Sequence, residues 1–152
     1  MSDKQTGMYQ QINKISILAK EYFYLDDREH IMLHQQLLPV LIIRGSKHKN
    51  IHPHTAKHVY ISRRSLKHYV ESRKKELLKN HTKENALQKI LFAVNKIPEV
   101  IINFDRYELE PPNHAYIKDY SNIGYPSLRV LLDTKKEHLE IKSIHFTKIR
   151  IN

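Results

Sequence analysis

The sequence is 152 residues long, 40% hydrophobic and free of cysteine, and its net charge at pH 7 is +10. This length fits one domain with a continuous core, and the lack of cysteine excludes disulfides, thiolate metal sites and a cysteine nucleophile. No apolar run approaches the ~20 residues that span a bilayer, and the polar start lacks a signal peptide's apolar stretch. We therefore expect a cytoplasmic protein with no membrane partner; delivery to a target cell without a cleaved signal fits the same features.

The excess positive charge lies in a single segment, residues 44–83. This segment holds twelve lysines and arginines against two carboxylates, Glu71 and Glu76, whereas the rest of the chain is balanced. Clustered cations attract phosphates and speed the encounter with polyanions. We therefore expect a nucleic-acid backbone as the partner, the alternative being a solvated face that only keeps the protein soluble.

The first part of the chain is predicted to be helical. Apolar residues recur at helical spacing from Met8 to Phe23,. A second amphipathic helix is expected over 31–38, ending before Pro39, and a short strand over 40–43,. Within a single domain, 1–152, residues 1–50 thus form a helical N-terminal extension.

The best-defined unit is a short strand, 59–61, followed by a helix that Ser62 caps,. The predicted inward stripe of this helix consists of Leu66, Val70, Leu77 and the stem of Arg73. A neighbouring face carries Arg64, His68 and Ser72, spaced four residues apart,.

A further helix is expected over 84–94, with Pro98 ending it, and strands joined by short turns follow,. The four predicted strands are 100–109, 114–120, 128–133 and 139–149. Short connections favour an antiparallel meander. The predicted fold class is α+β, with N-terminal helices followed by a four-stranded antiparallel sheet.

The last predicted strand changes its alternation. Leu139 and Ile141 have one parity, whereas Ile144 and Phe146 have the other. A bulge at 142–143 would bring all four to the core side. The opposite face would then present Lys142 or Ser143, together with His145 and Thr147, and bulges often re-aim side chains beside active sites.

Two surfaces are candidates for binding or chemistry. At the start of the capped helix, backbone N–H groups with Arg63, Arg64 and Lys67 would form an anion site, and His68 exchanges protons near neutral pH. The alternative is a basic helix whose histidine only hydrogen-bonds. The second candidate is a sheet face where aromatics alternate with cations, as suits unpaired bases and phosphates, although tyrosine and threonine favour strands anyway. Its residues are Tyr116, Lys118, Tyr120, Arg129, His145 and Thr147.

We expect neither a metal nor another cofactor. The loop histidines are His48, His52, His54 and His58. Several imidazoles within eleven residues could bind zinc, but Pro53 prevents helical pairing and no carboxylate lies between them,. The sequence also has no glycine-rich phosphate loop,.

The order of these parts resembles the phage-associated branch of the barnase–EndoU–colicin–RelE-like (BECR) nucleases. The resemblance rests on the basic segment VYISRRSLKHYVESR, a second helix, and strands containing AYIKDY, SLRVLLD and LEIKSIHF. It covers about 57–149 and implies a nuclease-like core there: a metal-independent ribonuclease, commonly a toxin, with helices packed on a four-stranded antiparallel sheet.

The resemblance also implies site residues. The family's helix histidine and following arginine fall on His68 and Arg73, and its tyrosine- and lysine-bearing strand falls on Tyr116, Lys118 and Tyr120. The terminal-strand hydroxyl, usually a threonine, falls on Ser143, where this chain departs from the pattern.

Carried over, these roles imply endoribonuclease activity by 2′-OH transesterification. His68 would be the base, and either His145 or Tyr116 the acid. The phosphorane charge would be stabilised by Arg73, Lys118 and Arg129. The partners would be RNA, with transfer RNA among the candidates, and an acidic immunity or antitoxin protein. Two alternatives stay open: a non-catalytic nucleic-acid-binding module, and a degenerate nuclease fold used as an effector or interaction protein.

Overall fold

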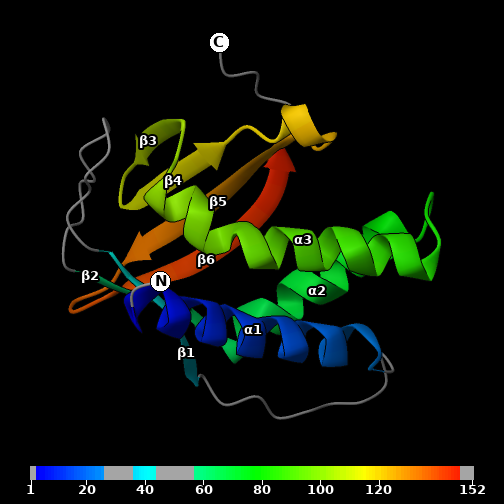
Figure 1. The fold of residues 1–152 in the computed structure, drawn as a ribbon, viewed down its shortest axis with the longest axis horizontal. Helices are drawn as coiled ribbons and strands as arrows, with labels where there is room; N and C mark the ends of the chain where they lie inside the picture. The colour runs from blue at the N-terminus through cyan, green and yellow to red at the C-terminus, as the bar shows by residue number, and fades with distance from the viewer. Residues whose placement is uncertain (1–2, 26–35, 44–56, 148–152) are drawn as a thin grey trace.

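The computed structural model describes residues 3–25, 36–43 and 57–147, with side chains from Gln11 onward. Over these ranges helices and strands follow one another with short connections (Figure 1). In chain order they are α1 (Asp3–Phe23), β1 (Leu37–Ile43), β2 (Lys57–Ser62), α2 (Arg63–Leu77), α3 (Lys83–Ile102), β3 (Arg106–Glu110), β4 (Asn113–Lys118), the 3-10 helix η1 (Ser121–Ile123), β5 (Ser127–Thr134) and β6 (Leu139–Thr147). The α+β class is confirmed.

The sheet is larger than the predicted four-stranded meander. Its strand order is β1-β2-β6-β5-β4-β3, and each pair is antiparallel except β2–β6, which is parallel. The expected meander corresponds to β3 to β6, except that its first strand, predicted from residue 100, begins only at Arg106 because α3 continues to Ile102. β1 and β2 extend the meander to a six-stranded mixed sheet. Parallel pairing joins strands that are distant in sequence, so local turn signals could not reveal it.

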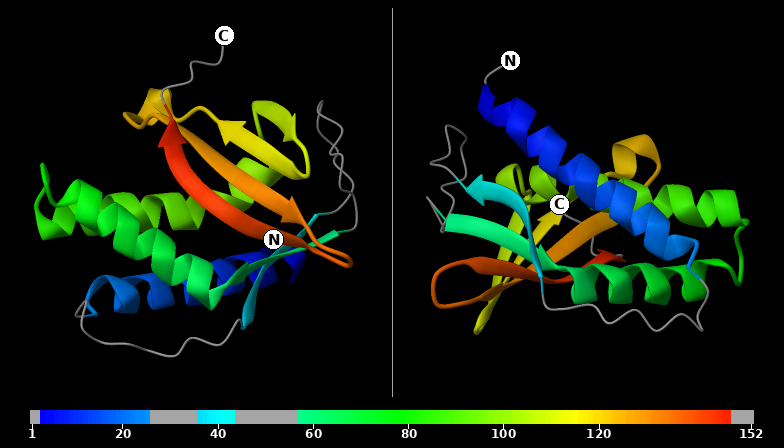
Figure 2. Two further views of the ribbon diagram at one scale, coloured as in Figure 1. Left: turned by 180° about the vertical axis from the view of Figure 1, so that it is seen from behind. Right: turned by 90° about the horizontal axis from the view of Figure 1, so that it is seen from below.

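The helices form a layer against this sheet. Figure 1 shows α3 crossing in front of the strands, and Figure 2 shows β6 toward the viewer when the molecule is seen from behind. Each helix contacts the other two, and α3 also contacts β1, β4, β5 and β6. Within the described ranges, no helix is both long and apolar enough to cross a membrane.

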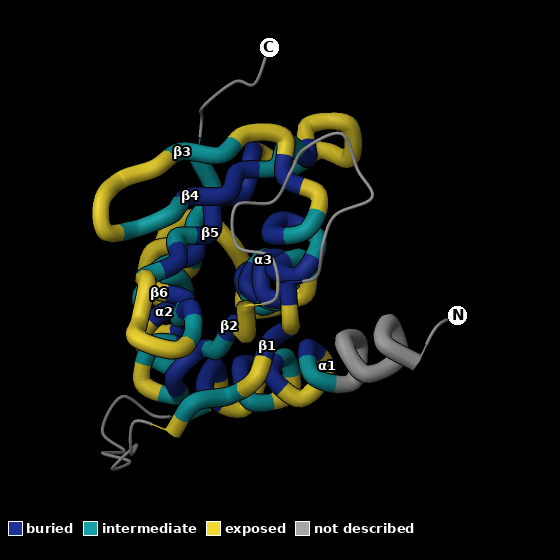
Figure 3. The backbone as a smooth tube through the Cα atoms, turned by 90° about the vertical axis from the view of Figure 1, so that its left-hand side faces the viewer, coloured by how far each residue is buried: buried dark blue, intermediate teal, exposed yellow. Residues whose placement is uncertain are grey.

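One continuous core joins the helices to the sheet. The predicted apolar stripe of α1 is confirmed, because Ile12, Ile15, Ala19, Tyr22 and Phe23 are buried in it. In Figure 3 the buried stretches lie along α3 and the strands, and the exposed stretches lie mainly at turns. Residues of α1 and β1 thus pack in the same core as those of the strands after residue 100,.

The expectation of a helix over 31–38 is wrong at its end. Leu37 and Leu38 begin β1, while residues 31–35 lie outside the described ranges. Pro39 is exposed in β1, and the register with β2 shifts between Pro39 and Leu41. A proline is tolerated in this position because β1 is an edge strand with a local irregularity.

The prediction that Pro98 ends a helix is also wrong. α3 continues through it to Ile102, and Pro98, Val100 and Ile101 are all buried. An internal proline removes one backbone hydrogen bond to the residue four positions earlier, here Val94. Burial of two further core residues, Val100 and Ile101, on the last turn offsets that loss.

The predicted bulge in the last strand is confirmed. Leu131 pairs with Ser143 and Leu132 with Ile141, so Lys142 is the extra residue. Leu139, Ile141 and Ile144 are buried, and Phe146 is half-buried against the core. The bulge thus lets β6 keep its apolar residues on the helix side throughout, while Ser143 and His145 take the other side.

Candidate functional site

A cavity of about 400 Å³ lies between α2 and β6, and Ile61 of β2 also lines it. The α2 wall consists of Arg64, Ser65, His68, Tyr69, Ser72 and Arg73. The β6 wall consists of Ile141, Lys142, Ser143, Ile144 and His145. The lining contains two imidazoles, three cations and three serine hydroxyls, but no carboxylate. Such a set of donors suits an anion, because each side chain can donate a hydrogen bond or bear positive charge.

The α2 wall follows from the capping and periodicity of the helix. Ser62 is the N-cap in extended conformation (φ −75°, ψ 149°), and its Oγ accepts a hydrogen bond from the Ser65 N–H at 3.0 Å, as predicted,. Leu66 and Val70 are buried, which sets the rotation of the helix and leaves His68 exposed along the cavity.

Arg73 comes from the same helix and is partly restrained. Its Nη1 donates to Glu76 Oε2 at 2.9 Å. Its Nε is buried and has no hydrogen-bond partner in the described part of the chain. Nη1 of this guanidinium is therefore anchored by Glu76, while its buried Nε donor has no acceptor,.

The β6 wall follows from the bulge. Without the extra residue, strict alternation would send Ser143 to the same side as Leu139 and Ile141. With it, Ser143 and His145 share the side that faces away from the core, and Lys142 is exposed beside them. The bulge therefore places the terminal-strand hydroxyl and His145 in the cavity wall opposite that of His68.

His145 lies in a positive environment. Burial lowers its pKa below the usual 6.5, the charges of Arg129 and Arg73 lower it further, and Glu110 opposes them. Arg129 lies opposite His145 in the β5–β6 ladder and forms an ion pair with Glu110. Arg129 itself is buried and outside the cavity lining. Burial and the two guanidinium charges therefore lower the pKa of His145 and favour its uncharged imidazole, the form that accepts a proton,.

The predicted anion site at the start of α2 is divided by the fold. Arg64 lines the cavity. Arg63 and Lys67 instead lie near Tyr22 of α1: burial raises the pKa of this tyrosine, and their two positive charges partly oppose that rise. Lys67 also pairs with Glu71, and the Arg63 N–H donates to the Gln36 carbonyl at 3.0 Å. The cations of this segment thus lie on two sides of the helix rather than around its N-terminus.

The tyrosines of the predicted polar face are in the core. Tyr116 is fully buried and Tyr120 is 4% exposed. Tyr116 pairs with Val130 and Lys118 with Leu128, so these alternate residues of β4 lie on the side of the sheet that the helices cover,. Burial and the neighbouring Tyr107 raise the pKa of Tyr116 far above its usual value of 10.0. The expectation that Tyr116 and Tyr120 stack on bases, or that Tyr116 acts as an acid, is therefore wrong.

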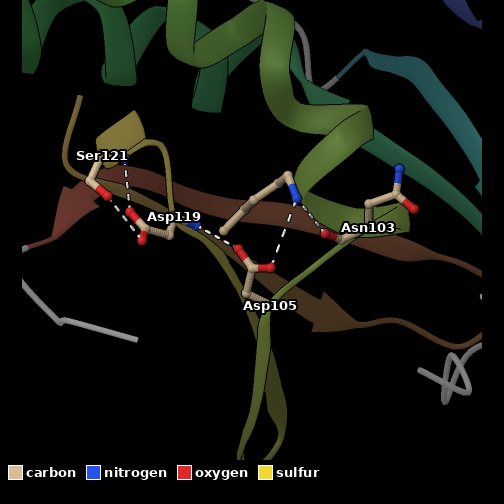
Figure 4. A network of polar contacts seen from close by, with 5 residues as sticks. Asn103, Asp105, Asp119 and Ser121 are labelled. Atoms are coloured by element: carbon tan, nitrogen blue, oxygen red, sulfur yellow. Dashed lines mark hydrogen bonds and ion pairs between the residues drawn. The ribbon is translucent and has the colours of Figure 1, made fainter. Parts of the chain in front are cut away.

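Lys118 is engaged elsewhere, at the end of α3. Its Nζ donates to the carbonyl of Asn103, the C-cap of α3, at 3.0 Å and lies 4.0 Å from Asp105 Oδ1. Asp105 also accepts from the Asp119 N–H, and Asp119 accepts from the Ser121 N–H, both at 2.8 Å (Figure 4). Lys118 is not among the cavity-lining residues, so the structure gives it a capping role in place of the expected catalytic one,.

The histidine-rich loop falls largely outside the described residues, which leaves its metal prediction untested for His48, His52 and His54. His58 is exposed on β2 and stacks against Tyr60 with ring centroids 6.2 Å apart. In residues 3–25, 36–43 and 57–147, no three histidine or carboxylate side chains are arranged to hold a metal ion.

Three lining residues that could bind an anion were not among the expected site residues: Ser65, Ser72 and Lys142. Two signals were available in the sequence: the four-residue spacing of Ser72 from His68, and the parity change at Lys142.

Comparisons with protein-family models, with curated proteins and with solved structures found no match to this chain. A functional assignment therefore depends on the chemistry of the cavity itself.

Proposed function

We propose that the protein is an endoribonuclease that cleaves RNA by 2′-OH transesterification in the cavity between α2 and β6, without a metal ion. One observation carries the proposal: two imidazoles and the cations Arg64, Arg73 and Lys142 surround one cavity whose lining has no carboxylate. A phosphodiester supplies the negative charge that these cations attract, and the two imidazoles supply the base and acid that its cleavage requires.

In the proposed reaction His145 is the base and His68 the acid. His145 removes the proton from the ribose 2′-OH, whose oxygen attacks the adjacent phosphorus. The bond from phosphorus to the 5′-oxygen breaks, and protonated His68 gives its proton to that oxygen, leaving a 2′,3′-cyclic phosphate and a 5′-hydroxyl. These roles reverse the sequence-based expectation, because burial and the Arg129 and Arg73 charges lower the pKa of His145 and favour its uncharged form.

The cations stabilise the charge that develops on the phosphorane. Arg73 is placed for this because it lines the cavity and is anchored on Glu76,. Arg64 and Lys142 approach from opposite walls, and the Ser143 hydroxyl can donate to a phosphate oxygen,. Arg129 acts through His145 as a positioning residue, because it does not line the cavity.

A specific observation favours a second candidate, a nucleic-acid-binding module without turnover. Within the described chain, neither His68 nor His145 has a hydrogen-bond partner that would orient its ring, and catalytic imidazoles are usually oriented by a further group,. Under either proposal the partner is RNA, and an acidic immunity or antitoxin protein would be complementary to the same cavity.

The test uses purified protein, an RNA dinucleotide and total RNA, all in EDTA. We expect cleavage with a 2′,3′-cyclic phosphate product, and loss of about 10²–10⁴-fold in rate for each of His145→Ala and His68→Ala. His81→Ala is the matched control, because this exposed histidine follows α2 and is not in the cavity lining. A dinucleotide with a 2′-deoxy group at the attacking position should be inert. Salt-sensitive binding without any cleavage, or cleavage unaffected by both substitutions, would contradict the proposal.

A further inference from the structure

Half-buried aromatic rings and two lysines form a surface cluster at the end of β6. α3 contributes Lys89, Phe92 and Lys96, whose spacing of three and four residues places them on one face of the helix,. Tyr125 follows η1, and Phe146 is the penultimate residue of β6. We call these five residues the aromatic–lysine patch. In Figure 1 the tip of β6 lies between η1 and the middle of α3.

The rings of the patch form a stack. Phe92 and Tyr125 are parallel, with centroids 3.8 Å apart and planes at 6°. Phe146 lies 6.2 Å from Phe92 and 5.9 Å from Tyr125, at 21° and 27°. All three pack against the core and remain half-buried, so each side chain keeps some contact with solvent.

The lysines lie over these rings. Lys89 Nζ is 5.3 Å from the centroid of Tyr125, and Lys96 Nζ is 5.7 Å from that of Phe92. Lys96 also pairs with Glu99 at 3.4 Å, whereas Lys89 has no carboxylate partner among the residues described. A lysine held over a ring by cation–π attraction, with no acid to neutralise it, is available to a phosphate.

The patch and the cavity are neighbours along β6. Phe146 follows Ile144 by two residues on the same face of β6, and Ile144 both lines the cavity and packs in the core. A strand rises about 3.3 Å per residue, so a polynucleotide lying in the cavity meets the patch within its next nucleotides.

We propose that the aromatic–lysine patch binds the single-stranded RNA segment adjacent to the phosphate held in the cavity. The identity of this ligand rests on the proposed function. A base stacks on Tyr125 in place of the Lys89 side chain that lies over this ring, and its flanking phosphates pair with Lys89 and Lys96,. Aromatic rings stack on any base, and the lysine charges bind phosphates, which every nucleotide carries. The patch therefore gives affinity for single strands without sequence selection.

The experiment measures binding of a fluorescent 2′-O-methyl RNA oligonucleotide, which cannot be cleaved, and in parallel cleavage of an RNA dinucleotide, which is too short to reach the patch. Tyr125→Leu keeps the apolar contact with the core but removes the aromatic face, and should weaken oligonucleotide binding about 5- to 100-fold. Its dinucleotide cleavage rate should equal that of the wild type. Tyr24→Leu is the matched control, because Tyr24 is 61% exposed on the turn after α1.

Lys89→Gln provides a second variant that leaves the core intact. It should remove about one phosphate contact. The slope of the logarithm of the binding constant against the logarithm of the salt concentration should therefore become shallower by ~0.7, the value for one contact on a single strand. Lys136→Gln, at the exposed turn between β5 and β6, should leave the slope unchanged.

Wild-type oligonucleotide affinity in both Tyr125→Leu and Lys89→Gln, with thermal unfolding showing both variants folded, would overturn the proposal and leave the patch as a packing cluster. Weakened binding in both variants together with a wild-type protein that never cleaves RNA would support the patch while refuting the ribonuclease activity. The failures of the two proposals are therefore distinguishable.

Discussion

Arg129 on β5 lies directly opposite His145 on β6, and its guanidinium charge, after burial, is a principal cause of the lowered pKa of that imidazole. Glu110 completes the arrangement, because it forms an ion pair with Arg129 and opposes its effect on His145. Besides burial, the pKa of His145 thus depends on a charge pair between β5 and β3, outside the cavity that the imidazole lines.

Arg129→Gln should raise the pKa of His145. The substitution removes a positive charge that disfavours the imidazolium and leaves the Glu110 carboxylate, which favours it,. The shift can be followed by NMR titration of the His145 ring proton. Arg106→Gln is the control, because Arg106 is exposed on β3 and pairs with Glu108. An unchanged His145 titration would contradict the electrostatic account.

Glu110→Gln should move the same pKa in the opposite direction. Without the carboxylate, Arg129 is no longer compensated and the imidazolium of His145 becomes less favourable,. The rising limb of the pH–rate profile, where the base loses its proton, should therefore move to lower pH. If this limb stays in place while the NMR pKa falls, His145 is not the base.

The free energy of unfolding should decrease as the pH falls below about 6.5. The folded pKa values of His145 and His114 both lie below the usual 6.5, mainly because of burial. Between the folded and unfolded pKa values the unfolded state binds more protons, so stability is present above this window and is lost as the pH falls through it. Urea denaturation at pH 7.5 and 5.5 measures the difference, and His145→Gln should reduce it. An equal difference in that variant would mean that His145 does not contribute.

Ser62→Ala should destabilise the protein by about 1 kcal/mol. The alanine removes the Oγ acceptor of the Ser65 N–H and leaves one N-terminal donor of α2 without its cap,. Thr82→Ala tests the same effect in α3, where the threonine Oγ1 accepts from the Asn85 N–H at 3.2 Å. Both can be measured by urea denaturation, and Ser62→Asp should retain most of the stability. Equal stability of Ser62→Ala and wild type would show that the cap is dispensable.

Tyr116→Ala should cost roughly 3 kcal/mol or more, because a fully buried ring is lost from the core,. Tyr116→Phe should leave RNA cleavage unchanged, because this residue lies outside the cavity. The paired measurements are urea denaturation for the first variant and the dinucleotide assay for the second. A large loss of cleavage in a folded Tyr116→Phe protein would restore the role that the sequence resemblance implied.

Alternation along a strand identifies which residues share a face, but not which face the helices cover. The parity change between Ile141 and Ile144 was sufficient to predict the bulge, because only an inserted residue keeps both on one side,. The shared parity of Tyr116 and Lys118 was also correct, yet Ala115 and Ile117 on the opposite face are equally buried. Neither face of β4 is polar, so the alternation alone does not show which face the helices cover. The sequence therefore predicts solvent exposure for the tyrosine face, which belongs to the core.

Local signals placed the N-cap at Ser62 and the inward side of α2, and these two features define one wall of the cavity. The opposing wall depends on the position of β6 beside β2, and therefore on contacts between residues some eighty positions apart, such as Val59 with Leu139. No periodicity within either segment encodes that pairing. His68 and His145 could be recognised individually, but their meeting required the three-dimensional fold.

The same long-range pairing has a consequence for the order of events during synthesis. The cavity needs residues 61–73 from one wall and 141–145 from the other, so a nascent chain that has not yet reached β6 has α2 without its counterpart. Domains fold as units while the ribosome extends them, and the last strand here occupies the centre of the sheet,. A ribonuclease assembled in this way would emerge beside ribosomal RNA with its cutting groups still apart, and would become active only after β6 has been translated.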